Sequence, residues 1–123
     1  MANPNIVNVS TINGKTVFQA IGTGQVQILE NPESSGKILK LNSLVISNVD
    51  GTDSADVTAI VHNQDDLGGT GYHLAKTITV PADATLILID KSTSIYLTED
   101  MSLGLSASAA SDLEAILSYE EIS

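Results

Sequence analysis

Residues 43–61 read SLVISNVDGTDSADVTAIV, and the fold class can be argued from this stretch outward. On either side of a turn rich in Asp, Gly and Ser, apolar residues recur at every second position, as Leu44 and Ile46 do. Such alternation is typical of a β-strand with one buried face, and the turn composition favours a reversal of the chain. We therefore expect a β-hairpin over Ser43–Val61.

A looser copy of this pattern closes the chain in SLGLSASAASDLEAILSY. Leu103 and Leu105 stand where Leu44 and Ile46 stood, and DLEAIL at 112–117 echoes DVTAIV at 56–61. We expect a second hairpin here. Internal duplication is one interpretation of the echo, and the common pattern of all sandwich hairpins is the other.

The length and composition favour one β-rich domain. The chain has 123 residues, no Cys, no Trp and a single Phe, so its core must be built from Val, Ile, Leu and Ala. A chain of this length closes one core, and branched aliphatic residues favour sheets over helices. The lack of Cys excludes disulfides, thiolate chemistry and zinc held by Cys.

Fifteen acidic residues against five Lys and no Arg give a net charge of −10. The lysines are scattered, whereas a surface that binds polyanions needs clustered basic residues, so nucleic acid and anionic membranes are poor partners. No apolar run approaches the roughly 20 residues of a membrane helix. The start MANPNIVNV lacks the features of a signal peptide, so we expect a protein made in the cytoplasm.

The N-terminal region predicts an arm followed by a hairpin. Met1–Asn5 suits an extended arm, and Asn13-Gly14 is a strong signal for a two-residue turn, which predicts a hairpin over Ile6–Ala20. We expect an arm and first strand over 1–12 and a sandwich domain over 13–123.

Further strands follow, and a polar, glycine-rich loop is expected at Gln64–Gly71. In the strand Ile38–Asn48, the alternation of apolar and polar residues shifts by one position near Asn42-Ser43, which predicts a β-bulge. From Tyr72 to Val80, even-numbered and odd-numbered residues are expected on opposite faces. The expected strands are Gln25–Leu29, Ile38–Asn48, Val57–Asn63, Tyr72–Val80, Thr85–Ile89 and Ser94–Leu97. Nine or ten short strands with frequent turns predict an all-β, antiparallel β-sandwich of jelly-roll or immunoglobulin-like type.

The turn at Asp50, Asp53 and Asp56 is a weak candidate for calcium binding. Carboxylates in a flexible loop suit Ca²⁺, but the run lacks the full EF-hand pattern, and Asp, Gly and Ser are also what a tight turn requires. Turn chemistry is the preferred interpretation. We expect no cofactor.

Catalysis is not expected. His62 and His73 flank the glycine-rich loop and could begin a metal site with Asp65 or Asp66, although strand-end histidines more often have no such role. No G-x-S-x-G motif accompanies the Ser, His and Asp residues. The glycine-rich loop also lacks the Lys and the following helix of a phosphate-binding loop.

Apolar residues at outward positions point to a partner. If Leu113, Ala115, Leu117 and Tyr119 face the core, Ile116 and Ile122 lie on the other face, as does Ile60 on the earlier hairpin. A covered face explains this shared pattern, with the arm or another subunit as the cover. The candidate contact residues are Ile6, Val7, Val9, Ile60 and Ile116.

Three segments resemble small virion structural proteins of tailed bacteriophages, of the cyanophage type. They are SLVISNVDGTDSADVTAIV, LAKTITVPADATLILIDKSTSIYLTEDMSLGLSASA and DLEAILSYEEIS, within Leu39–Ser123, roughly two-thirds of the chain. The shared features are a Ser-Asn-x-Asp-Gly-Thr turn, a Val-Pro-Ala-x-Ala-Thr-Leu bend, an Ile-Tyr-Leu strand and a Ser-Tyr-Glu-Glu end. None is a catalytic motif.

The resemblance implies a β-sandwich in a phage particle, as a capsid decoration or cement protein. It also implies contacts with other virion proteins, a homo-oligomer such as a trimer, and location in the virion after synthesis in the host cytoplasm. A position in the neck, tail or fibre is the alternative within this class. A small calcium-binding or glycan-binding module is the alternative outside it.

Overall fold

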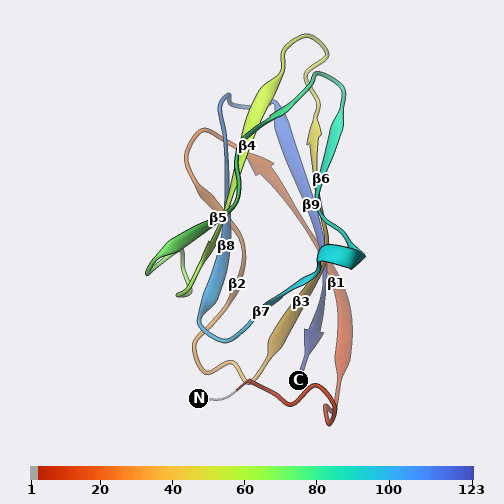
Figure 1. The fold of residues 1–123 in the computed structure, drawn as a ribbon, viewed down its shortest axis with the longest axis vertical. Coiled ribbons are helices and arrows are strands. Elements are labelled where there is room, and N and C mark those ends of the chain that lie inside the picture. The colour runs from red at the N-terminus through yellow and green to blue at the C-terminus, as the bar shows by residue number, and fades with distance from the viewer. Residues whose placement is uncertain (1–2) are drawn as a thin grey trace.

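The computed structural model describes residues 3–123, so Met1 and Ala2 of the expected arm lie outside the described residues. Within this range the chain forms nine strands and one short 3₁₀ helix (Figure 1). The elements are β1 (Ile12–Ile21), β2 (Val26–Asn31), β3 (Ile38–Asn48), β4 (Ala55–His62), β5 (Gly71–Val80), β6 (Thr85–Ile89), η1 (Lys91–Thr93), β7 (Ile95–Leu97), β8 (Met101–Ala107) and β9 (Leu113–Ile122).

The strands form two antiparallel sheets that pack as a sandwich, which confirms the expected fold class. The five-stranded sheet has the order β1-β9-β3-β6, with β7 beside β6 on the same edge of β3. The four-stranded sheet has the order β2-β8-β4-β5. No helix in residues 3–123 is long and apolar enough to cross a membrane.

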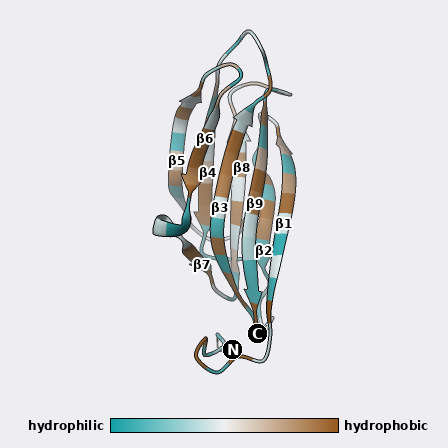
Figure 2. Cartoon of the chain, turned by 90° about the vertical axis from the view of Figure 1, so that its right-hand side faces the viewer, coloured by the Kyte–Doolittle hydropathy of each residue, from teal (hydrophilic) through white to brown (hydrophobic). Residues whose placement is uncertain are grey.

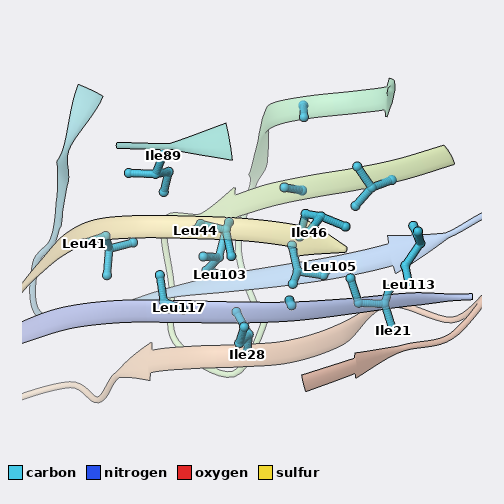
Figure 3. Packing of buried hydrophobic residues seen from close by; sticks show 14 of the residues in the cluster. Ile21, Ile28, Leu41, Leu44, Ile46, Ile89, Leu103, Leu105, Leu113 and Leu117 are labelled. Atoms are coloured by element: carbon cyan, nitrogen blue, oxygen red, sulfur yellow. The ribbon is translucent and has the colours of Figure 1, made fainter. Parts of the chain in front are cut away.

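Branched aliphatic side chains fill the space between the sheets, as the composition predicts (Figure 3). Leu44 and Ile46 of β3 meet Leu103 and Leu105 of β8 in this layer. The largest fully buried side chains are Ile21, Leu41, Leu44, Ile46, Ile89, Leu97, Leu103, Leu105, Leu113, Leu117, Val57 and Val80. The four expected core positions in β9 are all buried, but Ile122, expected on the outer face, is only 5% exposed.

The predicted bulge in the third strand is confirmed. The pairing of β3 with β9 shifts between Leu41 and Ser43, and both Leu41 and Leu44 are fully buried. An extra residue in one strand moves the following side chains to the other face, so the slip in the apolar phase keeps one face of β3 in the core.

The predictions of a hairpin over Ser43–Val61 and of a second hairpin at the end of the chain are wrong. β3 and β4 lie in different sheets, and so do β8 and β9. The reason is that all four are interior strands: β3, for example, has β9 along one edge and β6 with β7 along the other, so β4 has no place beside it. The two segments cross between the sheets in opposite senses, since β3–β4 leaves the five-stranded sheet and β8–β9 enters it.

The prediction of a hairpin over Ile6–Ala20, with its turn at Asn13-Gly14, is also wrong. Both residues lie inside β1, where they pair with Glu121 and Glu120 of β9. Residues 6–11 form no strand, so the only long partner for this region is β9, and its ten-residue pairing overrides the local turn preference.

The single alternation expected across Tyr72–Val80 is interrupted. Ala75 and Val80 are both buried, although strict alternation would place them on opposite faces. The pairing of β4 with β5 shifts twice around Ala59, and Thr77 has a left-handed backbone with φ of 47°. These irregularities turn the strand and return Ala75 to the core.

Buried asparagines join the two sheets at opposite ends of the sandwich. Asn31, at the end of β2, donates to the carbonyl oxygens of Lys37 and Leu97, the second of which belongs to the other sheet. Asn48, at the end of β3, donates to those of Asp53 and Val80. Each amide therefore holds a loop and the opposite sheet together.

Candidate interaction surface

An apolar row crosses the outer face of the five-stranded sheet, the side of the molecule seen in Figure 2. The register aligns Phe18 of β1 with Ile116 of β9, Ile116 with Val45 of β3, and Val45 with Ile87 of β6. Phe18 is 73% exposed, Ile87 62% and Ile116 41%, and Val45 is half-buried. Ala115 and Leu117 beside Ile116 are buried, so the row faces away from the core.

Polar rows border this apolar row on both sides. On one side the hydroxyl oxygens of Thr16 and Ser118 lie 3.2 Å apart, and on the other those of Ser47 and Thr85 lie 3.3 Å apart. A groove of about 260 Å³ opens beside the row, and its lining is Phe18, Gln19, Ala20, Ser47, Glu114, Ala115 and Ile116. Glu114 is the one charged residue in that lining, so the surface is largely uncharged on a protein of net charge −10.

The predicted contact residues are spread over three places. Ile116 lies in the apolar row, whereas Ile60 lies on the four-stranded sheet, half-buried against Gly71. Ile6 and Val7 are exposed on the arm, and Val9 is half-buried. Phe18, Val45 and Ile87 were missed. The alternation of β1 could have revealed Phe18, but the continuous apolar run in β6 carries no information about which residues face outward.

The arm is attached to the sandwich at both of its described ends. The side-chain oxygen of Asn3 accepts from the backbone N–H of Glu99, and Thr11 exchanges two backbone hydrogen bonds with Ser123. Between these points the backbone N–H of Asn8 donates to the carbonyl oxygen of Asn5. The described part of the arm, residues 3–11, thus lies at the same end of the molecule as the C-terminal end of β9 (Figure 2).

Asp50 and Asp56 of the acidic turn make separate side-chain contacts, and Asp53 takes part through its backbone. The Asp50 carboxylate accepts from the backbone N–H groups of Thr52 and Asp53, which holds the pKa of Asp50 below its ordinary value. Asp56 instead accepts from the hydroxyl of Thr79. Within residues 3–123 no three His, Asp or Glu side chains gather closely enough to hold a metal ion.

A fourth carboxylate adds repulsion at this end of the sandwich. Desolvation, followed by the nearby charge of Asp50, raises the pKa of Asp112. The carboxylates of this turn are therefore arranged for local backbone contacts, at some electrostatic cost to Asp112.

The two histidines lie on neighbouring strands, where His62 is opposite Gly71 and His73 is opposite Ile60. The ring Nε2 of His62 is 3.0 Å from the side-chain oxygen of Gln25, and its buried Nδ1 has no hydrogen-bond partner. The loop aspartates bond elsewhere: Asp65 accepts from the backbone N–H of Glu33, and the backbone N–H of Asp66 donates to Glu30.

A small ion-pair cluster lies at the end of the sandwich near the arm. Glu121 binds Lys15 at 3.1 Å and Lys37 at 3.2 Å. The hydrogen bond from Lys15 is the largest of the effects that lower the pKa of Glu121. Two of the five lysines are therefore engaged in neutralising one carboxylate.

No protein-family model and no curated protein sequence matches the chain. Among solved structures, a chain from the disulfide-linked pili of Bacillus endospore appendages matches with a TM-score of 0.56 and 13% identity, over 100% of this chain and 96% of that one. A chain from the acid-stable capsid of Helicobacter pylori bacteriophage KHP30 matches with a TM-score of 0.51 and 8% identity, over 94% and 90%. At these identities the likeness is one of fold.

Proposed function

We propose that this protein is a structural subunit that assembles onto a bacteriophage particle, in the manner of a capsid decoration protein. The observation that carries the proposal is the apolar row from Phe18 to Ile87, exposed across four strands. Two further points support it: the virion-protein resemblance of Leu39–Ser123, and the occurrence of the same fold in a phage capsid and in pili. The proposed role involves no enzymatic activity.

The energetics favour an assembled state over a single isolated contact. Burying the exposed parts of Phe18, Ile87 and Ile116 contributes about 3–5 kcal/mol in total. Association of two proteins costs an estimated 4–15 kcal/mol in lost freedom, so this row alone binds weakly. Copies that are joined to one another can bind a repeating shell through several rows at once, and such multivalent binding is far tighter than the binding of one copy.

The chain differs from the pilus subunit in one chemical respect. Those pili are disulfide-linked, and this chain has no Cys, so disulfides cannot join its copies. Largely uncharged contact surfaces suit this requirement, because charged residues are depleted at the centre of protein interfaces.

The test is add-back to phage particles that lack the protein. Wild-type protein is expected to co-sediment with the particles, and Ile87→Lys to lose at least tenfold in apparent affinity. Tyr72→Lys is the matched control, because Tyr72 is 63% exposed on the four-stranded sheet, against 62% for Ile87. Equal binding by both variants would remove the apolar row from the proposal.

Mass spectrometry of purified particles tests the location itself. A copy number comparable to that of the major capsid protein is expected for a capsid decoration protein, and a copy number comparable to that of the neck or tail proteins would assign the chain there instead. Complete absence from the particle overturns the proposal.

A further inference from the structure

Among residues 3–123, β1 is the outer strand that lacks the bulges, Pro residues or short length that protect the other sheet edges, and its one charged residue is Lys15. β2 has a bulge after Gln27, β5 has two register shifts, and β6 and β7 are short and interrupted by η1. β1 instead pairs with β9 over ten residues without any shift. Exposed, long, regular edge strands are templates for pairing with another chain, and natural proteins usually block them with bulges, Pro or short length.

The hydrogen-bonding pattern shows which groups of β1 are open. Thr11 and Ser123 exchange both backbone bonds, and in an antiparallel pair such residues alternate with residues that point away. Since the register continues unbroken, the odd-numbered residues of β1 bond to β9, and the N–H and C=O groups of the even-numbered residues point outward.

A side-chain contact supports this assignment. The amide of Gln19 donates to the carbonyl oxygen of Ala20, which must therefore point away from β9. Among the described residues, the open backbone groups of Ile12, Gly14, Thr16 and Phe18 have no partner from another strand or loop. An unsatisfied row of donors and acceptors thus lines this edge.

Phe18 lies where this open edge meets the apolar row, and it is the most exposed member of that row. The strand also offers little repulsion to an approaching copy. It has no acidic residue, and its one charge, on Lys15, is paired with Glu121, which also binds Lys37. The edge therefore combines open backbone groups, an exposed ring and low charge in a protein of net charge −10.

We propose that β1 pairs antiparallel with β1 of a second copy, across a two-fold axis at Phe18. This places Phe18 opposite Phe18 of the second copy and Thr16 opposite Ala20 of the second copy. The pairing uses residues 15–21 of each chain, and the apolar row then runs without a break through both five-stranded sheets. Two-fold axes at Thr16 or Val17 would also place the outer faces of both sheets on the same side. They would not bring the two Phe18 rings into direct contact, however, and contacts between aromatic rings on neighbouring strands add stability.

The inference rests on the proposed function, because the doubled row is the surface that would meet the particle. An isolated row contributes too little to bind a shell alone, and a dimer presents two rows in fixed orientation. The two-fold pair differs from the trimer that the family resemblance implies.

Cysteine cross-linking tests the pairing directly, because the natural chain contains no Cys. The paired Phe18 residues would have Cα atoms about 5.5 Å apart. This lies within the roughly 4.4–6.8 Å that a disulfide spans. Air oxidation of Phe18→Cys with a copper catalyst is expected to give a covalent dimer as the major species, and Ile87→Cys, an exposed position at the far end of the row, is expected to give little.

A mixing experiment fixes the register. Thr16→Cys mixed with Ala20→Cys should yield a heterodimer, whereas Thr16→Cys alone should not, because its two Cα atoms would be displaced by about 13 Å along the strands. Cross-linking of Thr16→Cys alone would move the axis and overturn the proposed register.

Sedimentation separates failure of this inference from failure of the proposed function. Wild-type protein is expected as a dimer at tens of micromolar, and Phe18→Lys as a folded monomer with unchanged circular dichroism, while Ile87→Lys remains a dimer. A monomeric wild type, or a trimer without cross-links at residue 18, overturns the inference even if the protein binds particles. A β1 dimer that is absent from particles overturns the proposed function and leaves the inference standing.

Discussion

Replacing Asn48 should destabilise the sandwich more than replacing any exposed asparagine. Its side chain is buried and makes three hydrogen bonds: to the carbonyl oxygens of Asp53 and Val80 at 3.0 and 2.9 Å, and from the N–H of Asp50 at 2.9 Å. The bond to Val80 is fully buried, so water cannot replace it when the amide is removed. The partners in the exposed turn can recover water.

The expected loss for Asn48→Ala follows from these environments. A buried polar group left without a partner costs about 1–3 kcal/mol, and an ordinary hydrogen bond contributes about 0.5–1.5 kcal/mol net. The full penalty for the Val80 carbonyl oxygen, together with part of the hydrogen-bond energy at Asp53 and Asp50, gives a loss of about 3 kcal/mol in the free energy of unfolding. For a domain of this size that corresponds to a fall of roughly 10 °C in the unfolding temperature.

Urea unfolding followed by circular dichroism measures the effect, with Asn8→Ala in the exposed part of the arm as the matched control. The control is expected to stay within about 0.5 kcal/mol of wild type. Asn48→Asp should be at least as destabilised as Asn48→Ala at pH 7, because it turns a carboxylate oxygen toward the two carbonyls. A change of less than about 0.5 kcal/mol for Asn48→Ala would refute the assignment of stability to these bonds.

Four further outcomes are expected. Asp112→Asn should raise the unfolding temperature at pH 7, since the raised pKa of Asp112 means that the fold disfavours its charge; the gain should vanish near pH 3, and a lower unfolding temperature at pH 7 would contradict this. Glu121→Gln should reduce stability by under about 1 kcal/mol at pH 7, and the difference from wild type should shrink as the pH falls through the lowered pKa of Glu121, because a lowered pKa stabilises the fold only while the carboxylate is charged. Calcium, compared with chelator, should shift the unfolding temperature by less than about 2 °C, and a larger rise would indicate binding selective for the folded state. Deleting Met1–Val9 should leave a folded protein by circular dichroism, with a loss of oligomer or particle binding if the arm reaches a neighbour; normal assembly would exclude that role.

The sequence was most informative where a pattern concerned a single strand. The phase slip at Asn42-Ser43 predicted the bulge in β3, and the alternation in β9 predicted that Ile116 faces outward; both follow from the two-residue period of a strand. Pairing between strands could not be predicted in the same way. The Asn13-Gly14 signal depends only on local backbone preference, and it was overridden by a partner more than 100 residues away.

The interaction surface was predictable only in part for a related reason. Phe18, Ile116 and Ile87 form one row because β1, β9 and β6 come together in a particular order around β3, and no local pattern specifies that order. The burial of the Asn31 and Asn48 side chains was not predicted, for the same reason. Their partners across the sandwich become visible only when both sheets are in place.

The placement of β8 and β9 constrains the order in which the protein can fold. These two strands follow the other seven in the chain, yet β8 lies between β2 and β4, and β9 between β1 and β3. During synthesis β1 and β2 therefore have no strand partner until about 100 residues have emerged, while β4 with β5 and β3 with β6 can pair early. Folding dominated by such distant pairings typically takes milliseconds to seconds. Throughout that interval both edges of β1 are open, so nascent chains on neighbouring ribosomes can join through the strand that later pairs two finished subunits.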